Sequence, residues 1–147
     1  MKVSRKLQAP VEHMYAQIVN SSIHDIKKQT KKELTYDQLE GFEYNKVFES
    51  KQKATIKIIE ATPCERYVFE TKTAIRNFQT AYTLISTGEE SCEVICEETI
   101  HTTGWLQQMN DLMVGIALGY TKKRYLRHML DAMAKTYEEI RAEITTV

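Results

Sequence analysis

The sequence predicts an α+β domain, and three observations lead to this prediction. A helical pattern follows a short strand near residue 1. Apolar residues then recur at every second position through residues 43–102, in runs separated by short polar loops, which is typical of antiparallel strands. From Gly104 the helical spacing returns and continues almost to residue 147. An antiparallel sheet of about six strands, with one face covered by a long C-terminal helix, accounts for this order.

The N-terminal segment predicts a strand, a helix and one further turn. Met1–Gln8 is the expected strand, and Pro10 suits the first turn of a helix, where its missing N–H costs nothing. The basic stretch "KKQTKK" ends this helix, either as a solvated helix end or as an anion site. Thr35 and Gln38 stand at capping-box spacing ahead of Gly41, so a single helical turn is expected there. The helical spacing is carried by Val11, Met14, Tyr15, Ile18, Val19, Ile23 and Ile26.

Alternation of side chains predicts how the strands after Gly41 pair, because a shift of one residue turns every side chain to the opposite face. A four-residue "ATPC" loop places Ile58 opposite Tyr67. The same loop places Ile56 opposite Phe69. The expected strands are Glu43–Glu49, Lys53–Glu60, Glu65–Thr73, Arg76–Ser86 and Ser91–Thr102.

The last two strands carry their apolar faces at even-numbered positions, the first of them through Phe78, Thr80, Tyr82 and Leu84. Positions paired between the two strands must therefore sum to an even number. A three-residue loop at Gly88–Glu90 meets this condition. It sets Tyr82 opposite Cys96, and Thr80 opposite Glu98. The residues predicted to face the core are Tyr82, Val94 and Cys96, and those predicted to face away are Thr83, Glu93 and Glu97.

The C-terminal segment predicts a helix of about 35 residues and about 50 Å, which is longer than a small sheet, so we expect a bend or an overhanging end. Gly115 and Gly119 lie on one face of it. Glycine costs about 1 kcal/mol relative to alanine in a helix, so this face indicates close packing on the sheet or first helices, room for a ligand, or a dimer contact. The apolar stripe is Trp105, Met109, Leu112, Met113, Ile116 and Tyr120, continued by Leu126, Leu130, Met133, Tyr137 and Ile140.

Length and composition indicate a single domain over residues 1–147 with no nucleic-acid partner, because 20 basic residues balance 20 acidic ones. We expect no signal peptide and no stable membrane insertion. Cys64, Cys92 and Cys96 show no metal-binding spacing, and neither do the four histidines. Cys92 and Cys96 on one strand would lie about 13 Å apart, too far for a disulfide. These features predict a reduced, cytoplasmic protein without metal or cofactor.

Two stretches, "EGFEYNKVF" entering the sheet and "GWLQQMNDLMVGIALGYTKKR" opening the last helix, resemble the helix-grip fold of the START and plant pathogenesis-related superfamily, often called SRPBCC. More narrowly, "MKVSRKL", "DIKK", "QLEGFEY" and "NDLMVGIALGYTKKR" resemble a small bacterial family of uncharacterised proteins within it. The likeness spans nearly the whole chain, and none of these motifs is a known catalytic signature. It implies a curved sheet wrapped around the terminal helix, with a cavity between them that in many relatives holds an apolar ligand.

Glu98 is the one charged residue in step with the apolar face of its strand, so it could orient a ligand, act as an acid or base, or reach water at the strand end. Arg76 shares that face near its rim, where it could pair with a ligand or a carboxylate. The basic stretch "TKKRYLR" is either a solvated helix face or a surface that steers an acidic ligand or rests on anionic lipid. The candidate cavity-lining residues are Tyr67, Phe69, Thr80, Tyr82, Glu98, Trp105, Met109 and Met113.

These patterns favour a non-catalytic module that binds a small apolar or amphipathic molecule between sheet and helix. The first alternative is an enzyme of the same architecture, cyclase- or hydrolase-like, with Glu98 as acid or base and Tyr82 as hydrogen-bond donor to a polyketide-like or aromatic substrate. The second alternative is an interaction module or homodimer formed through the Gly115 and Gly119 face.

Overall fold

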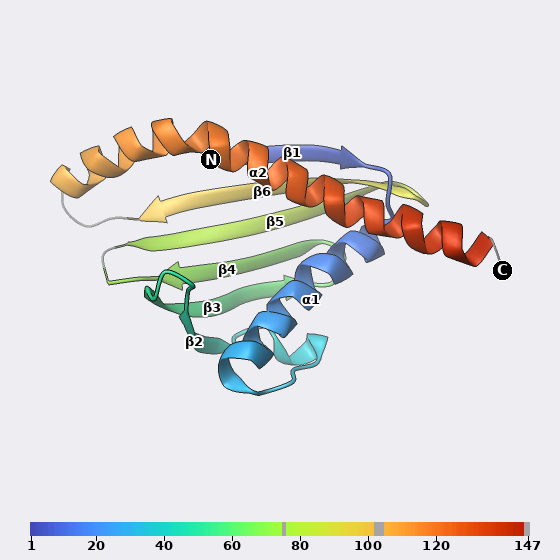
Figure 1. Ribbon diagram of the computed structural model, residues 1–147, viewed down its shortest axis with the longest axis horizontal. Coiled ribbons are helices and arrows are strands. Elements are labelled where there is room, and N and C mark those ends of the chain that lie inside the picture. The colour runs from blue at the N-terminus through green and yellow to red at the C-terminus, as the bar shows by residue number, and fades with distance from the viewer. Residues whose placement is uncertain (75, 102–104, 146–147) are drawn as a thin grey trace.

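The computed structural model of the chain describes residues 1–74, 76–101 and 105–145, and the side chains of residues 101–121 and 145 lie outside that description. The strands form one antiparallel sheet in the order β1-β6-β5-β4-β3-β2 (Figure 1). They are β1 (Lys2–Leu7), β2 (Glu43–Val47), β3 (Lys53–Thr62), β4 (Arg66–Lys72), β5 (Asn77–Gly88) and β6 (Ser91–His101). The helical elements are α1 (Val11–Thr30), the 3-10 turn η1 (Tyr36–Gln38) and α2 (Trp105–Thr145).

The predicted α+β class, with a six-stranded antiparallel sheet and a long C-terminal helix, is confirmed. The register of β5 and β6 is also confirmed, because Tyr82 lies opposite Cys96, and Thr80 lies opposite Glu98. The predicted faces hold as well: Tyr82, Val94 and Cys96 are buried, whereas Thr83, Glu93 and Glu97 are half-buried or exposed. We call the side of the sheet that carries Tyr82 and Cys96 the inward face.

The predicted register of β3 and β4 is wrong by two positions. Ile58 lies opposite Phe69 rather than Tyr67, and Ile56 lies opposite Thr71. A bulge between Ile58 and Glu60 changes the pairing toward the turn, where Ala61 faces Tyr67. Alternation could not reveal the error, because a shift of two residues leaves every side chain on its original face.

Two turns also differ from their expected form. Between β3 and β4 the connection is residues 63–65, in which Cys64 has a left-handed φ of 62°. Between β5 and β6, Gly88 already pairs with Ser91, so the loop is one residue shorter than the predicted Gly88–Glu90. A bulge between Ser86 and Gly88 absorbs the difference and preserves the register beyond it.

Helix α1 begins directly after Pro10, which stands in an extended conformation before the first turn rather than within it. Its apolar residues face the sheet at helical spacing. The helix ends where Lys31 adopts a left-handed φ of 67° and its N–H donates to the Lys27 carbonyl oxygen at 2.9 Å. The predicted single turn is the 3-10 turn η1, in which the Thr35 N–H donates to Oε1 of Gln38 at 2.9 Å.

Helix α2 packs along β1 and against α1 rather than across the middle of the sheet (Figure 1). We expected the terminal helix alone to cover the inward face. Instead α1 covers part of it, because α1 contacts β2, β5 and β6. The first strand joins the second helix through Arg5, whose guanidinium donates twice to the Asp131 carboxylate at 2.9 and 2.8 Å.

Polar contacts at two points show that α2 runs back along β6. Lys122 of α2 pairs with Glu98 near one end of β6, and Arg141 pairs with Glu90 beside its other end. The helix covers about 28 Å between these points at 1.5 Å per residue. The strand covers about 26 Å over the same stretch at 3.3 Å per residue. The first turns of α2 therefore extend past the end of β6, as Figure 1 shows.

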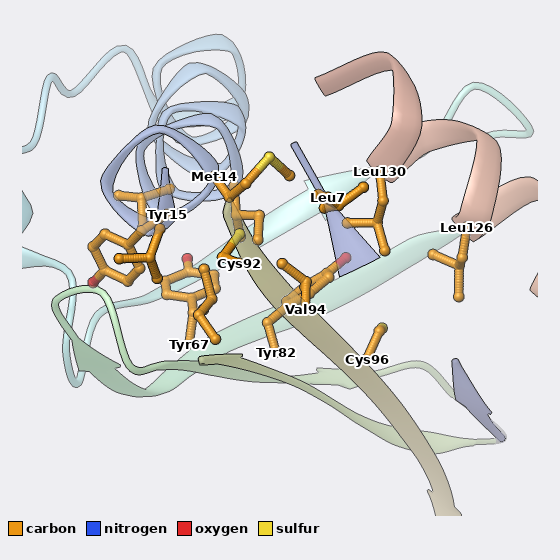
Figure 2. Packing of buried hydrophobic residues seen from close by; sticks show 14 of the residues in the cluster. Leu7, Met14, Tyr15, Tyr67, Tyr82, Cys92, Val94, Cys96, Leu126 and Leu130 are labelled. Atoms are coloured by element: carbon orange, nitrogen blue, oxygen red, sulfur yellow. The ribbon is translucent and has the colours of Figure 1, made fainter. Parts of the chain in front are cut away.

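The hydrophobic core lies where α1, the second half of α2 and the inward face meet. In Figure 2, Met14 and Tyr15 of α1 lie on one side of it, and Leu126 and Leu130 of α2 on the other. Side chains of the sheet fill the space between them, and Val94 and Cys92 are completely buried. The inward face is thus filled at the end that both helices cover.

Leu130 tests this packing, because its side chain is completely buried between α2 and the sheet. We expect Leu130→Ala to lower the free energy of unfolding by about 2–5 kcal/mol, since it leaves a cavity in the core. The matched change Ile140→Ala, on the exposed side of the same helix, should cost less than about 0.5–1 kcal/mol. Urea denaturation measures both, and equal losses would contradict the placement of α2.

The cysteines test the burial of the inward face. Burial raises the pKa of the Cys92 and Cys96 thiols to about 11, so at pH 8 only about one molecule in a thousand carries either thiolate. We expect native Cys92 and Cys96 to react with a thiol reagent far more slowly than half-exposed Cys64, and all three to react after denaturation. Mass spectrometry of labelled peptides measures this, and rapid native labelling of Cys96 would contradict it.

Candidate functional site

The strand registers arrange the inward face in rows that cross β4, β5 and β6. The first row contains Tyr67, Tyr82 and Cys96. The second row contains Phe69, Thr80 and Glu98, and the third contains Thr71, Phe78 and Ile100. Beyond the third row, Thr73 and Arg76 close the connection between β4 and β5.

Burial decreases from the first row to the third. Tyr67 and Cys96 are 1% exposed, whereas Phe69 and Thr80 are half-buried and Ile100 is 42% exposed. The decrease follows the helices, because the first row lies beneath α1 and the second half of α2 (Figure 2). The inward face therefore changes from a packed core at the first row to a more accessible surface at the third.

The first row places two candidate residues, Tyr67 and Tyr82, within the core. Burial is the main cause that raises the pKa of both phenols, to about 12 for Tyr67. The neighbouring Cys96 raises the pKa of Tyr82 further. Both groups therefore stay protonated at neutral pH.

The second row brings together three candidate residues, Phe69, Thr80 and Glu98. The Glu98 side chain is 13% exposed, and its carboxylate accepts a hydrogen bond from Nζ of Lys122. Its backbone is also held, because the Glu98 N–H donates to the Met1 carbonyl oxygen at 2.8 Å, and the Met1 amine donates to the Glu98 carbonyl oxygen at 2.9 Å. The predicted inward position of Glu98 is thus observed, and an ion pair to α2 balances its charge.

A cavity of about 240 Å³ adjoins the third row, at the end of the sheet away from the first row. Its floor is Thr71 and Phe78, which lie opposite each other on β4 and β5. The turn between β2 and β3 and the turn between β4 and β5 form its walls, and both lie at one end of the sheet (Figure 1). The described lining residues are Phe48, Ser50, Gln52, Thr71, Thr73, Arg76 and Phe78.

Backbone hydrogen bonds hold the first of these walls. The Phe48 N–H donates to the Gln52 carbonyl oxygen at 2.9 Å, and the Lys51 N–H donates back to the Phe48 carbonyl oxygen at 2.8 Å. Lys51 adopts a left-handed φ of 68°, which closes the turn. The Lys46 ammonium lies 5.0 Å from the centroid of the Phe48 ring and pairs with Asp25 of α1 at 3.0 Å. This wall is therefore connected to the first helix.

The second wall is held in the same way. The Thr73 N–H donates to the Arg76 carbonyl oxygen at 2.8 Å, and the Arg76 N–H donates to the Thr73 hydroxyl oxygen at 3.1 Å. These two bonds set where the Arg76 side chain leaves the backbone, and its Nε atom is buried. The described residues of the cavity thus supply two phenylalanine rings, several hydroxyl and amide groups, and one guanidinium.

Reasoning from the sequence singled out Arg76 as a rim residue and Phe78 as part of the apolar face, and both line the cavity. It did not single out Phe48, Ser50, Gln52, Thr71 or Thr73 as lining residues. Phe48 carried a signal, because it continues the alternation of Tyr44 and Lys46 on the inward face. The candidates Trp105, Met109 and Met113, and the environment of Gly115 and Gly119, fall on helix α2 where side chains lie outside the described residues.

Within the described residues, no group of three or more histidine, cysteine, aspartate or glutamate side chains could hold a metal ion. The helices in that part of the chain also lack a stretch with the length and apolar character needed to cross a bilayer. The described residues that line the cavity supply hydroxyl, amide, aromatic and guanidinium groups.

Comparison with solved structures shows the fold. Norcoclaurine synthase from Thalictrum flavum is similar as a point mutant in complex with a transition-state analogue, with a TM-score of 0.65 and 13% identity over 96% of this chain and 94% of that one. The same enzyme in complex with dopamine and hydroxybenzaldehyde has a TM-score of 0.63 and 13% identity, over 95% of this chain and 86% of that one. A conserved protein from Geobacillus kaustophilus has a TM-score of 0.58 and 13% identity, over 92% of this chain and 95% of that one.

These likenesses and the topology show a helix-grip fold. No curated protein matches the chain. One family model does, and it matches residues 1–119, which is most of the chain. The chain belongs to the family described as "Domain of unknown function (DUF3284)".

Proposed function

We propose that this protein binds a small, largely apolar molecule on the inward face of its sheet, at the end that α1 and the second half of α2 leave uncovered. The observation that carries the proposal is the cavity of about 240 Å³ beside the third row, with Phe48 and Phe78 among its lining residues. Small molecules usually bind in concave sites that combine apolar surface with polar groups, and the described lining of this cavity supplies both.

The size of the cavity limits the ligand. Pockets that bind drug-sized ligands have volumes of about 300–1,000 Å³, and this cavity of about 240 Å³ is smaller. A single ring with a short substituent is the appropriate size. Such a ligand could extend toward Phe69, Thr80 and Glu98, because the second row directly adjoins the third.

The fold supports the proposal by analogy alone. A helix-grip neighbour at 13% identity, norcoclaurine synthase, is described in complex with two small aromatic molecules, dopamine and hydroxybenzaldehyde. We also propose that the chain is a member of the START and SRPBCC superfamily, which its sequence motifs resemble. On this view Tyr67, Phe69, Thr80, Tyr82 and Glu98 form the inner end of the ligand site, and Trp105, Met109 and Met113 of α2 are the further candidate contacts.

The described groups favour binding over catalysis. An enzyme that uses Glu98 and Tyr82 would need a proton to move to or from one of them. Burial raises the pKa of Tyr82, which makes its phenol a weaker acid, and the Glu98 carboxylate is engaged by Lys122. Both residues could instead orient a ligand, Tyr82 as a hydrogen-bond donor and Glu98 as an acceptor. The three free thiols support a reducing, cytoplasmic location for such a protein.

A neutral probe, 3-phenylpropanamide, tests the proposal by NMR titration of the purified protein. We expect it to bind at one site, and we expect Thr71→Phe to weaken its binding at least about tenfold, because the added ring fills the cavity above β4. Thr99→Phe is the matched control, since Thr99 is exposed on the other face of the sheet. This control should bind the probe as the unmodified protein does.

Thermal unfolding of the same variants separates loss of the site from loss of the fold. Thr71→Phe should unfold within a few degrees of the unmodified protein, because it fills open space rather than a packed core. Absence of probe binding to the unmodified protein, or equal weakening by both substitutions, would refute the proposed site.

A further inference from the structure

We infer that the exposed side of α2 is a docking surface for an anionic lipid bilayer, to which the protein adsorbs without inserting. The feature that carries this inference is a stripe of basic side chains on the helix, away from the core residues Leu126 and Leu130. The inference goes beyond the proposed function and does not depend on the cavity. The basic stripe comprises Arg124, Arg127, His128 and Lys135, all of them exposed.

Helical spacing brings the basic stripe together. Its members stand at positions i, i+3, i+4 and i+11 from Arg124, which fall within about 100° of one another around a helix. Leu126 and Leu130 point to the other side, where they are buried against the sheet. The helix packs mainly on β1 and α1. The stripe therefore forms one continuous exposed face, about 17 Å long at 1.5 Å per residue.

The positive charge of the stripe is not neutralised among the described residues. Asp131 is the one acidic residue between Arg124 and Lys135 in the sequence. Both of its carboxylate oxygens accept hydrogen bonds from Arg5, at 2.9 and 2.8 Å, so Arg5 balances its charge. In the described part of the chain, Arg124, Arg127 and Lys135 belong to no ion pair.

This excess is a local separation of charge, because the whole chain has 20 basic and 20 acidic residues. Acidic side chains resume on α2 at Glu138 and Glu139. Glu138 lies about 21 Å along the helix from Arg124 at 1.5 Å per residue. Exposed charges are largely screened beyond about 10 Å at 0.1 M salt. The acidic turn therefore limits the docking surface to the stripe and does not cancel its charge.

An exposed aromatic side chain beside the stripe points to a bilayer as the anionic partner. Tyr125 is 67% exposed, whereas the large apolar side chains from Leu126 to Tyr137 are buried or half-buried. Tyrosine is enriched at the boundary between water and lipid, where its ring lies among the headgroups. Clusters of arginine and lysine on a helix attract anionic headgroups. Nucleic acid is less suited, because a neutral chain lacks the basic excess of such proteins.

Sedimentation of the full-length protein with lipid vesicles tests the inference. The vesicles contain either phosphatidylcholine alone or an equimolar mixture of phosphatidylcholine and phosphatidylserine. At pH 7 and 0.1 M salt we expect at least about tenfold tighter binding to the anionic vesicles, because each basic side chain near such a surface contributes about fivefold. Salt at about 1 M should remove most of this preference, since it shortens the screening length to about 3 Å.

Paired substitutions assign the binding to the stripe. Arg124→Gln with Arg127→Gln should weaken binding to the anionic vesicles at least about tenfold. Arg124→Lys with Arg127→Lys keeps both charges and should stay within about threefold of the unmodified protein. Lys53→Gln with Lys57→Gln is the matched control, because it removes the same charge from exposed positions of β3. This control should change binding by less than about twofold, and circular dichroism verifies the fold of each variant.

Tyr125→Trp reports whether this face makes the contact. The chain has one native tryptophan, Trp105, so the emission of the unmodified protein serves as the reference. With anionic vesicles we expect the variant to show an additional blue shift, because the ring at position 125 leaves water for the headgroup region. An emission maximum at position 125 that does not move while the protein is bound would contradict docking through this face.

Other outcomes would also overturn the inference. These are absence of binding to the anionic vesicles, equal binding to both kinds of vesicle, and unchanged binding after Arg124→Gln with Arg127→Gln. Equal losses in this variant and in the control would show that net charge, rather than the stripe, determines binding. Tighter binding to a short DNA duplex than to the anionic vesicles would replace the bilayer with nucleic acid as the partner.

Discussion

The position of α2 along β1 determines how the rest of the sheet is used. Leu126 and Leu130 of this helix close the core over one end of the inward face, together with α1. The same helix is joined to β6 through Glu98 and to the turn after β5 through Glu90. The second half of the helix therefore covers the end of the inward face where the core lies, and among the described residues two turns bound the cavity at the other end. A packed core and an accessible cavity follow from this one placement.

The inward face is divided into a buried end and a more accessible end, so one small sheet can hold both a stabilising core and a cavity. The first row is buried, as a fold of this size needs for stability. The third row and the turns beyond it are more accessible, and such turns on a rigid sheet are where binding residues are often found. Because the rows follow one another directly along β4 and β5, a ligand at the cavity would contact side chains that are positioned by the core.

Much of the fold could be predicted from the sequence, because alternation and helical spacing are local properties. The pairing of Tyr82 with Cys96 followed from the parity of two strands joined by a short turn. The pairing of Ile58 with Phe69 did not, because a two-residue shift and a bulge preserve the faces that alternation reveals. The placement of α2 beside β1 depends on contacts across the whole chain, and spacing within the helix cannot specify them.

The candidate site could be predicted only where it coincides with a strand face. Phe78 lies on β5, and Arg76 precedes that strand in step with its alternation, so this pattern identified both. Ser50 and Gln52 lie in a turn, so their position depends on the backbone conformation at Lys51 and on how β3 pairs with β4. The two turns lie together at one end of the sheet only because of the order in which all the strands pair. No single segment of the sequence specifies that order.

A crystal structure determined under xenon pressure tests the central claim, that the inward face is filled at one end and open at the other. Xenon enters apolar cavities in proteins and does not enter well-packed cores. We predict xenon between Phe48 and Phe78 in the cavity, and no xenon between Leu7 and Leu130 in the core. Side chains of α2 filling the space above Thr71 and Phe78, with no xenon bound there, would contradict this account.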